Sequence, residues 1–248
     1  MAKEAITVSR RNDGQSLVGS LKKAWGARQP RGILCHKYKF IYYPVAKAGN
    51  SSMRIMIAEI EGLVVPGRPI RAPFEWVRVE ELENYPDYKR VVIVRNPWSR
   101  LHACYKNKIY WQHKSDGEIV RRRKAHAGFT RYNRLLRRKL FHPDMTFGEF
   151  VRIVARIPDA ISDRHFRSQY RAFCKRGGPS LADCVVRLEN FQAEMQAFLS
   201  SVGADDVEIK HLNSSRKAET ADPFDQELVD IIARRYRHDI ELLGYSEP

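Results

Sequence analysis

Two short apolar segments in this sequence each end close to a basic residue, and a helix signal follows each of them. Lys47 lies in the loop sequence PVAKAGNSS, which comes directly after the apolar segment KFIYY. Arg95 ends the run VVIVR, and Asn96 and Pro97 then provide a helix N-cap and a first helical residue. Basic side chains and the N–H groups that begin a helix both bind anions. The Lys47 loop and the Arg95 segment together therefore predict a phosphate-binding site.

The loop that contains Lys47 has the composition of a phosphate cradle. Small residues let backbone N–H groups approach an anion closely. The loop contains Ala48, Gly49, Asn50, Ser51 and Ser52 in succession. It is not a Walker A loop, because the lysine precedes the glycine instead of following it. An ordinary strand-to-helix turn with an exposed lysine is the alternative interpretation.

Arg95 stands where a nucleotide kinase usually has an aspartate that organises Mg²⁺. A guanidinium at this point indicates that a phosphate is bound directly by a cation, with no metal required. Ser99, one turn into the following helix, either adds a hydroxyl to the same phosphate or is simply exposed.

The elements that must position these residues alternate between strands and helices. Segments rich in β-branched or aromatic residues predict strands over 39–43, 89–94 and 184–188. Helices are predicted from the capping box of Thr146 and Glu149 to Pro158, over 190–203, and from Asp222, with Pro223 as first helical residue, to Gly244. This alternation predicts an α/β layered fold.

The chain has 248 residues and a formal net charge of +15, which favours an anionic partner. Nine Lys or Arg residues and no acidic residue lie between positions 119 and 143. Such a run forms either a solvated surface or a binding surface. The longest apolar runs are far shorter than a membrane span, and the N-terminal sequence lacks the apolar stretch of a signal peptide. The four cysteines form no CxxC pair, so we expect free thiols and a cytoplasmic protein.

The sequences PVAKAGNSS and VVIVRNPWSRLHACY resemble the two nucleotide-binding signatures of sulfotransferases that use 3′-phosphoadenosine 5′-phosphosulfate (PAPS). They resemble in particular the carbohydrate sulfotransferases related to the chondroitin, dermatan and HNK-1 enzymes and their bacterial relatives. Lys47 matches the lysine of the loop that binds the 5′-phosphosulfate, and Arg95 matches the arginine that holds the 3′-phosphate. The resemblance implies a P-loop-NTPase-like three-layer fold with a central, mostly parallel sheet flanked by helices, in a single domain over residues 1–248.

Three later segments resemble the same family in the same order: SDRHFRSQYRAFC (162–174), VVRLENF (185–191) and RRYRHDIELLGY (234–245). In the family the first lies beside the acceptor site, the second joins a strand to a helix, and the third is the terminal helix. One departure concerns the second signature, where Ala103 replaces a serine that contacts the 3′-phosphate. We predict that Ser99, one turn earlier on the same helix face, substitutes for that serine.

The resemblance implies transfer of a sulfuryl group from PAPS to a hydroxyl of a carbohydrate or glycolipid acceptor by in-line displacement, without a metal. Lys47 would stabilise the leaving oxygen of the product 3′-phosphoadenosine 5′-phosphate (PAP). His165 is predicted as the general base, because an unperturbed pKa of ~6.5 suits proton abstraction near neutrality. The alternative is that His165 only orders a loop through Asp163. Arg167 and Gln169 are predicted to hold sugar hydroxyls or carboxylates.

Two further basic elements complete the predicted site. The loop HLNSSRK (211–217) resembles the family's loop over the nucleotide, and Arg216 would add charge around the 3′-phosphate. A basic helical insertion, about 112–145, is predicted to line the acceptor cleft, with Arg121 drawing in an anionic glycan or lipid-linked saccharide. Peripheral contact with a membrane stays open.

No nucleic acid is expected as a partner, because no zinc finger, RNA-recognition motif or helix-turn-helix signal accompanies the charge. Two alternatives nevertheless remain from the sequence. One is a nucleic-acid-binding protein, and the other is a catalytically degenerate nucleotide-binding protein of the same fold.

Overall fold

The computed structural model describes residues 29–63, 72–109, 112–115, 118–121, 129, 132–133, 140–209 and 224–248, with side chains left out for 112–115 and 118–121.

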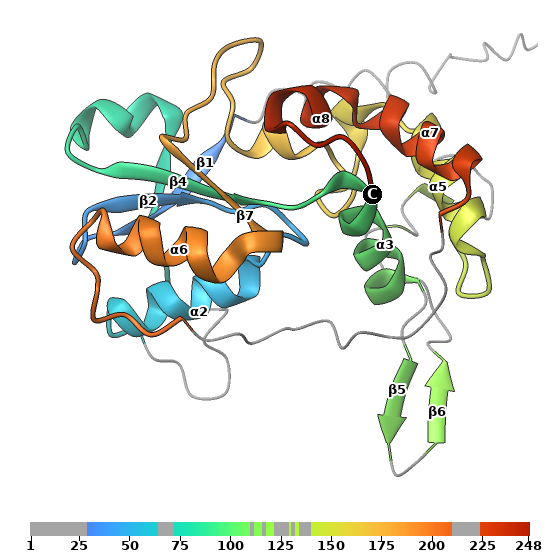
Figure 1. Ribbon diagram of the computed structural model, residues 1–248, viewed down its shortest axis with the longest axis horizontal. Helices are drawn as coiled ribbons and strands as arrows, with labels where there is room; N and C mark the ends of the chain where they lie inside the picture. Colours follow the sequence, from blue (N-terminus) through green and yellow to red (C-terminus); the bar gives the residue numbers. More distant parts are fainter. Residues whose placement is uncertain are drawn as a thin grey trace, which may run out of the picture.

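The fold is built on a sheet of five strands in the order β3-β1-β2-β4-β7 (Figure 1). The strands are β1 (Arg31–Cys35), β2 (Phe40–Tyr43), β3 (Trp76–Arg78), β4 (Lys89–Val94) and β7 (Cys184–Arg187). The predicted strands correspond to β2, β4 and β7, and those predictions are confirmed. These three strands run parallel, whereas β1 pairs antiparallel with both β2 and β3.

The sheet is therefore only partly parallel, and the expectation of a mostly parallel sheet is wrong on the side of β1 and β3. The reason is the connection between β1 and β2, which is a single turn over 36–39. Parallel neighbours need a crossover of a dozen or more residues, so a connection this short requires the antiparallel arrangement.

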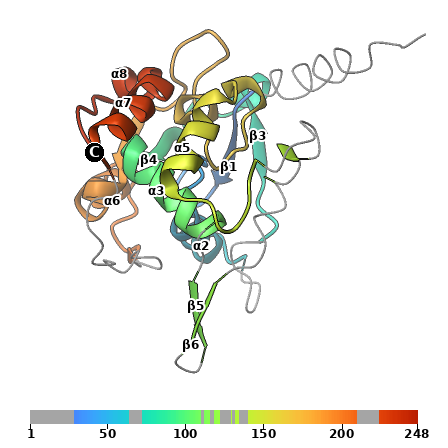
Figure 2. The ribbon, with the colours of Figure 1, turned by 90° about the vertical axis from the view of Figure 1, so that its right-hand side faces the viewer.

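Some helices flank the sheet, and others lie beyond one end of it (Figures 1 and 2). The α-helices are α2 (Asn50–Ile60), α3 (Pro97–Lys108), α5 (Phe147–Arg156), α6 (Phe191–Ser200), α7 (Gln226–Arg235) and α8 (Arg237–Leu243). Short 3₁₀ helices are η2 (Val79–Asn84), η3 (Asp159–Ile161), η4 (Gln169–Ala172) and η5 (Leu188–Asn190). Apolar residues of α2 and α6 pack against the sheet in one core, and those of α3, α5 and α7 form a second core.

Most predicted helix ends are confirmed. The Thr146 hydroxyl accepts the Glu149 N–H and the Glu149 carboxylate accepts the Thr146 N–H, as expected of a capping box. The last helix differs, because its N-cap is Asp225 and not Asp222, which lies outside the described residues with Pro223. This helix also breaks at Tyr236 into α7 and α8. It ends as predicted at Gly244, whose φ of 69° is the left-handed conformation that favours glycine.

The region predicted as a basic helical insertion contains two strands and, at Phe129, Tyr132 and Asn133, helical residues. β5 (Gln112–Ser115) and β6 (Glu118–Arg121) form an antiparallel pair that projects away from the sheet (Figure 2). The helical prediction is therefore wrong for 112–115 and 118–121. Phe129 and Tyr132 of the same region are buried in the second core, so part of this basic segment is anchored by its aromatic residues.

All four cysteines are free, as expected. Within the described part of the chain, no helix combines the length and the apolar character that a membrane crossing requires.

Candidate functional site

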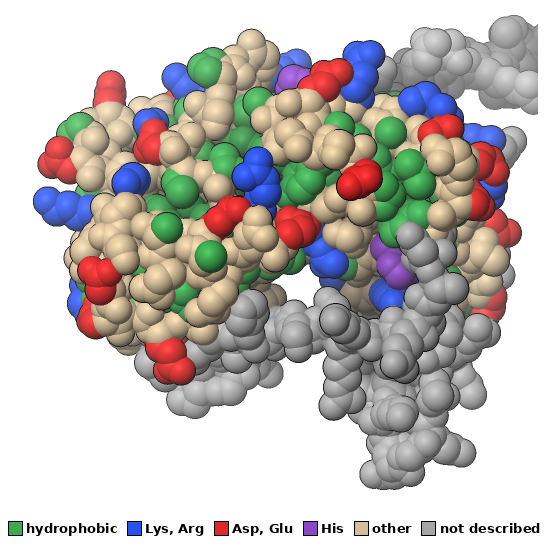
Figure 3. All heavy atoms as spheres, viewed as in Figure 1, with side chains coloured by type: hydrophobic (Ala, Val, Ile, Leu, Met, Phe, Trp, Pro, Cys, Tyr) green, Lys and Arg blue, Asp and Glu red, His purple; other side chains and the backbone are tan. Residues whose placement is uncertain are grey.

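The loops that follow β2, β4 and β7 lie at one edge of the sheet, because the carboxyl ends of parallel strands meet there. They carry Lys47, Arg95 and Glu189, respectively. This edge faces the helices of the second core, and both Lys or Arg and Asp or Glu side chains lie at the surface where the two parts meet (Figure 3). Ligands of open α/β sheets bind at such an edge.

The backbone of the Lys47 loop is held in an unusual conformation. Lys47 and Gly49 have φ values of 72° and 68°, both in the left-handed region. A side chain at position 49 would place its Cβ 3.1 Å from Leu188 Cδ1, so the loop needs glycine for its packing as well as for its φ. For lysine the same region costs about 1–2 kcal/mol. Such strain is typical of functional sites.

The N–H groups at the start of α2 are available to an anion. The N-cap Gly49 provides no side chain to accept them, and the N–H groups of residues 49–52 make no hydrogen bond among the described residues. By contrast, the Asn96 side chain accepts the N–H groups of Trp98 and Ser99 at the start of α3. The uncapped turn of α2 therefore fits a phosphate group, which accepts several N–H donors at a helix start.

Lys47 is partly buried among other cations. Burial, together with the positive charges of Lys108 and Arg95, lowers the pKa of its ammonium to about 8. An anionic ligand next to Lys47 would raise this pKa again, because a negative charge favours the protonated ammonium.

Arg95 is held from several sides. The Ser99 hydroxyl accepts the Arg95 Nε–H at 3.0 Å and donates to the Asn96 carbonyl at 3.2 Å. Burial lowers the pKa of Arg95, although the Glu189 carboxylate opposes this shift. Ser99 therefore orients the Arg95 guanidinium, and its predicted contact with a phosphate stays a prediction.

Gln169 binds the backbone of Arg95 through both atoms of its amide and is only 1% exposed. Both polar atoms of the Gln169 side chain are therefore engaged by Arg95, and its predicted sugar-binding role stays a prediction. Arg167 donates from Nε and Nη2 to the Ser162 carbonyl, which closes its own loop. Its role toward an acceptor stays a prediction.

His165 forms a buried pair with Asp163. The His165 Nδ1 lies 2.6 Å from Asp163 Oδ1, and the His165 N–H donates to the same oxygen at 3.0 Å. Burial lowers the pKa of His165 below 6.5, although the Asp163 carboxylate opposes this shift. A neutral imidazole that donates from Nδ1 has its basic lone pair on Nε2, as a general base requires.

Arg100 connects the Lys47 loop to the His165 segment. It is buried, and it donates to the Ala46 carbonyl at 2.9 Å and to the Arg167 carbonyl at 2.8 Å. Burial raises the pKa of the Cys104 thiol to about 12, and the charges of both Lys47 and Asp163 act on that thiol. The two segments therefore border the same face of α3.

Sequence reasoning missed Lys108, whose charge acts on both Lys47 and His165. The signal was present in the helix register. Arg100, Cys104 and Lys108 recur every four residues and so share one face of α3.

The C-terminal helices brace the His165 segment. The Tyr236 hydroxyl donates to the Phe166 carbonyl at 2.6 Å. The buried Asp239 carboxylate accepts the N–H groups of Gln169 and Tyr170 at 2.7 and 3.0 Å. The C-terminal helices therefore support the segment that carries His165 and Gln169.

Two predicted site residues cannot be placed. Arg121 ends β6, but its side chain lies outside the described residues, and Arg216 lies outside them altogether.

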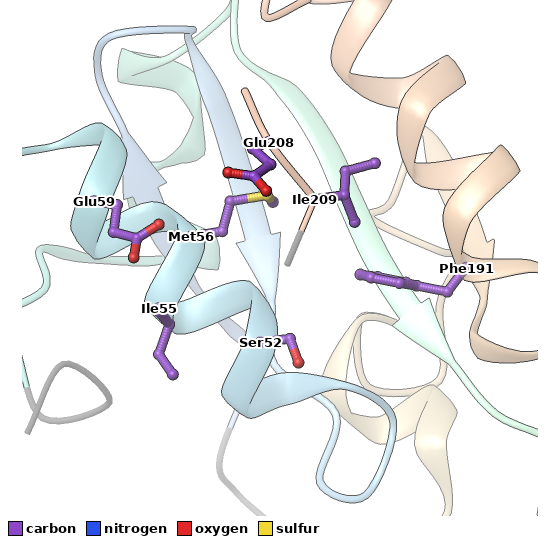
Figure 4. Close-up of a pocket in the computed structure, with 7 residues that line it drawn as sticks. All are labelled: Ser52, Ile55, Met56, Glu59, Phe191, Glu208 and Ile209. Carbon is purple, nitrogen blue, oxygen red and sulfur yellow. The ribbon is translucent and has the colours of Figure 1, made fainter. Parts of the chain in front are cut away.

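A small cavity lies behind the phosphate-binding turn, between α2 and the start of α6 (Figure 4). Its lining residues are Ser52, Ile55, Met56, Glu59, Phe191, Glu208 and Ile209. Ser52, from the first turn of α2, lies at one end of this space (Figure 4).

Among the described residues, no group of three or more His, Cys, Asp or Glu side chains is placed to hold a metal ion. A sequence profile described as the Sulfotransferase family matches residues 30–246. The chain belongs to the sulfotransferase family. The match covers the Lys47 loop, Arg95, the His165 segment and the terminal helices of this sulfotransferase. Comparisons with curated proteins and with solved structures gave no match.

Proposed function

We propose that this sulfotransferase moves a sulfuryl group from PAPS to a hydroxyl of a carbohydrate or glycolipid acceptor by in-line displacement. The observation that carries the proposal is the Lys47 loop, where a strained, partly buried lysine adjoins a helix start with unpartnered N–H groups. The fold expected of such an enzyme is the P-loop-like three-layer arrangement.

The residues present fit the nucleotide. The N–H groups of 49–52 and the Lys47 ammonium would hold the 5′-phosphosulfate, and Arg95, oriented by Ser99, would hold the 3′-phosphate. When bound, PAPS supplies the sulfuryl group and a phosphate leaving group. Lys47 would donate a hydrogen bond to the oxygen that gains charge as the bond to sulfur breaks.

The His165 Nε2 would accept the proton of the acceptor hydroxyl. Its partner Asp163 keeps the Nδ1 proton in place and stabilises the imidazolium that forms. The acceptor we propose is a carbohydrate or lipid-linked saccharide, including an anionic one, and a cytoplasmic, bacterial enzyme is the setting we propose.

The first test is calorimetric titration with PAP in the absence of metal, on the wild type and on Arg95→Ala. Micromolar binding that is lost in the variant supports the proposal. The matched control is Arg90→Ala, because Arg90 lies on β4, the strand that Arg95 directly follows, and pairs with Asp183 at 2.6 Å near the surface. Absence of PAP binding to the wild type would contradict the proposal, because the proposed donor site would then not hold the nucleotide.

A further inference from the structure

A group of arginines and aromatic residues lies beside α2 at the antiparallel side of the sheet. The Arg54 guanidinium carbon lies 4.8 Å from the ring centre of Phe74 and 6.0 Å from that of Trp76. The Arg31 guanidinium carbon lies 4.3 Å from the ring centre of Trp76. The partly exposed indole of Trp76 therefore contacts two guanidinium groups. We call Arg31, Arg54, Arg164 and Trp76 the arginine–tryptophan cluster.

Within the described part of the chain, no acidic side chain pairs with the arginines of this cluster. Arg31, Arg54 and Arg164 form no ion pair or side-chain hydrogen bond with any residue that the structure describes. The Arg54 Nε is buried without a partner, whereas its terminal nitrogens are equally unpartnered but not buried. Burial lowers the pKa of Arg54, and the charges of Arg164 and Arg31 lower it further. Gathering like charges around an unsatisfied buried donor costs free energy, which an anionic ligand would recover.

The cluster adjoins the candidate site on two sides. Arg54 follows Asn50 by four residues on α2, so both lie on the same helix face one turn apart. The Tyr42 hydroxyl donates to Asn50 Oδ1 at 3.4 Å, and the charge of Arg54 acts on Tyr42. Arg164 directly precedes His165 in the chain. An acceptor held by the cluster would thus lie next to both the phosphate-binding turn and the proposed base.

We propose that the arginine–tryptophan cluster is an acceptor subsite for a sugar residue that carries a carboxylate or sulfate group. Guanidinium groups bind such oxyanions through paired, charge-assisted hydrogen bonds. The flat apolar face of the indole contacts the C–H face of a sugar ring. The inference rests on the proposed function, because it assigns the cluster to the acceptor of that reaction.

Direct binding tests the subsite separately from turnover. The probes are a tetrasaccharide of alternating glucuronic acid and N-acetylglucosamine and its uncharged methyl ester, titrated into the PAP-saturated protein. The variants are Arg54→Gln and the control Arg237→Gln. Both variants remove one positive charge. Arg237 is a suitable control because it is exposed on α8, where it pairs with the exposed Glu241 at 3.6 Å.

We expect the ester to bind about tenfold more weakly than the acid, and Arg54→Gln to weaken the acid about tenfold while leaving the ester unchanged. Arg237→Gln should change neither by more than about twofold. Arg54→Lys should restore part of the affinity, because it keeps the charge but loses the planar fork. The melting temperature of Arg54→Gln should not fall, since the substitution relieves repulsion between like charges.

Equal effects of Arg54→Gln and Arg237→Gln, equal affinities for acid and ester, or no binding of the acid to the wild type would each overturn the subsite. So would a melting temperature that falls in Arg54→Gln with no change in affinity, which would assign the cluster to stability alone. PAP binding is measured separately on each variant. If PAP binds but Arg54→Gln has no specific effect, the subsite fails and the proposed function stands; if PAP does not bind, the proposed function itself fails.

Discussion

Gln169 and Arg95 are joined through both polar atoms of the glutamine side chain. The Arg95 N–H donates to Gln169 Oε1 at 2.9 Å, and Gln169 Nε2 donates to the Arg95 carbonyl at 2.7 Å. This double contact fixes the backbone from which the Arg95 guanidinium projects. If Arg95 holds the nucleotide as proposed, Gln169 positions Arg95 without touching the nucleotide itself.

Gln169→Glu tests this positioning role. The substitution keeps the shape of the side chain but leaves the Arg95 carbonyl without its donor and buries a carboxylate. We expect PAP affinity to fall about tenfold, measured by calorimetry, with a smaller effect on acceptor binding. Gln192→Glu is the control, because Gln192 is exposed on α6. An unchanged PAP affinity in a folded Gln169→Glu protein would contradict the positioning role.

Lys47 should govern the alkaline side of the pH profile. The free enzyme needs a protonated Lys47, whose pKa is about 8, so kcat/KM should fall above that pH. Bound nucleotide favours the ammonium, so the fall in kcat should occur at higher pH. Lys47→Arg should remove the alkaline fall, because a guanidinium stays charged, whereas Lys106→Arg should leave it in place. Lys47→Ala should lower kcat by about 10²–10³-fold with the fold intact, as judged by circular dichroism. An alkaline limb that survives in Lys47→Arg would assign it to another group.

Asp163→Asn separates the two roles considered for His165. If the pair acts in catalysis, loss of the carboxylate allows the wrong tautomer, and kcat should fall about 10²–10⁴-fold while PAP affinity stays unchanged. If Asp163 only orders the loop, the melting temperature and PAP affinity should fall together with kcat. The acid limb of the pH profile gives a second measurement. Because the pKa of His165 is lowered by burial, the wild-type limb should lie below pH 6.5.

The sequence contained enough information for the parallel strands and the two loops, because their signals are local. Apolar runs, the Asn96 cap and the capping box at Thr146 each depend on residues close together in the chain. β1 and β3 were missed because their pairing depends on contacts between distant segments, and the three residues of β3 are too few to show a pattern. Strands are stabilised by such cross-strand neighbours more than by their own composition.

The direction of polar side chains was harder to predict than their position. Gln169 and His165 lie in the same segment, yet one faces the Arg95 backbone and the other pairs with a carboxylate. Nothing in the segment distinguishes a glutamine that binds a ligand from one that binds a backbone carbonyl. The difference depends on where Asp239, seventy residues later in the chain from Gln169, holds the segment.

Asp239→Asn tests whether this distant brace supports the site. The two carboxylate oxygens accept the N–H groups of Gln169 and Tyr170, and burial raises the pKa of Asp239. An asparagine would turn an NH₂ group toward one of those donors, which should cost about 1–3 kcal/mol of unfolding free energy. For a chain of this size the melting temperature should fall by about 2–4 °C for each kcal/mol.

The control for this brace is Asp230→Asn. Asp230 is exposed on α7 and accepts only a hydrogen bond from Gln226 at 2.9 Å, so stability should change by less than about 0.5 kcal/mol. Because Asp239 holds the start of η4, we also expect Asp239→Asn to weaken PAP binding through Gln169 and Arg95. If the melting temperature falls but PAP affinity does not, Asp239 stabilises the fold without positioning Arg95, and the coupling between the terminal helix and the nucleotide site is absent.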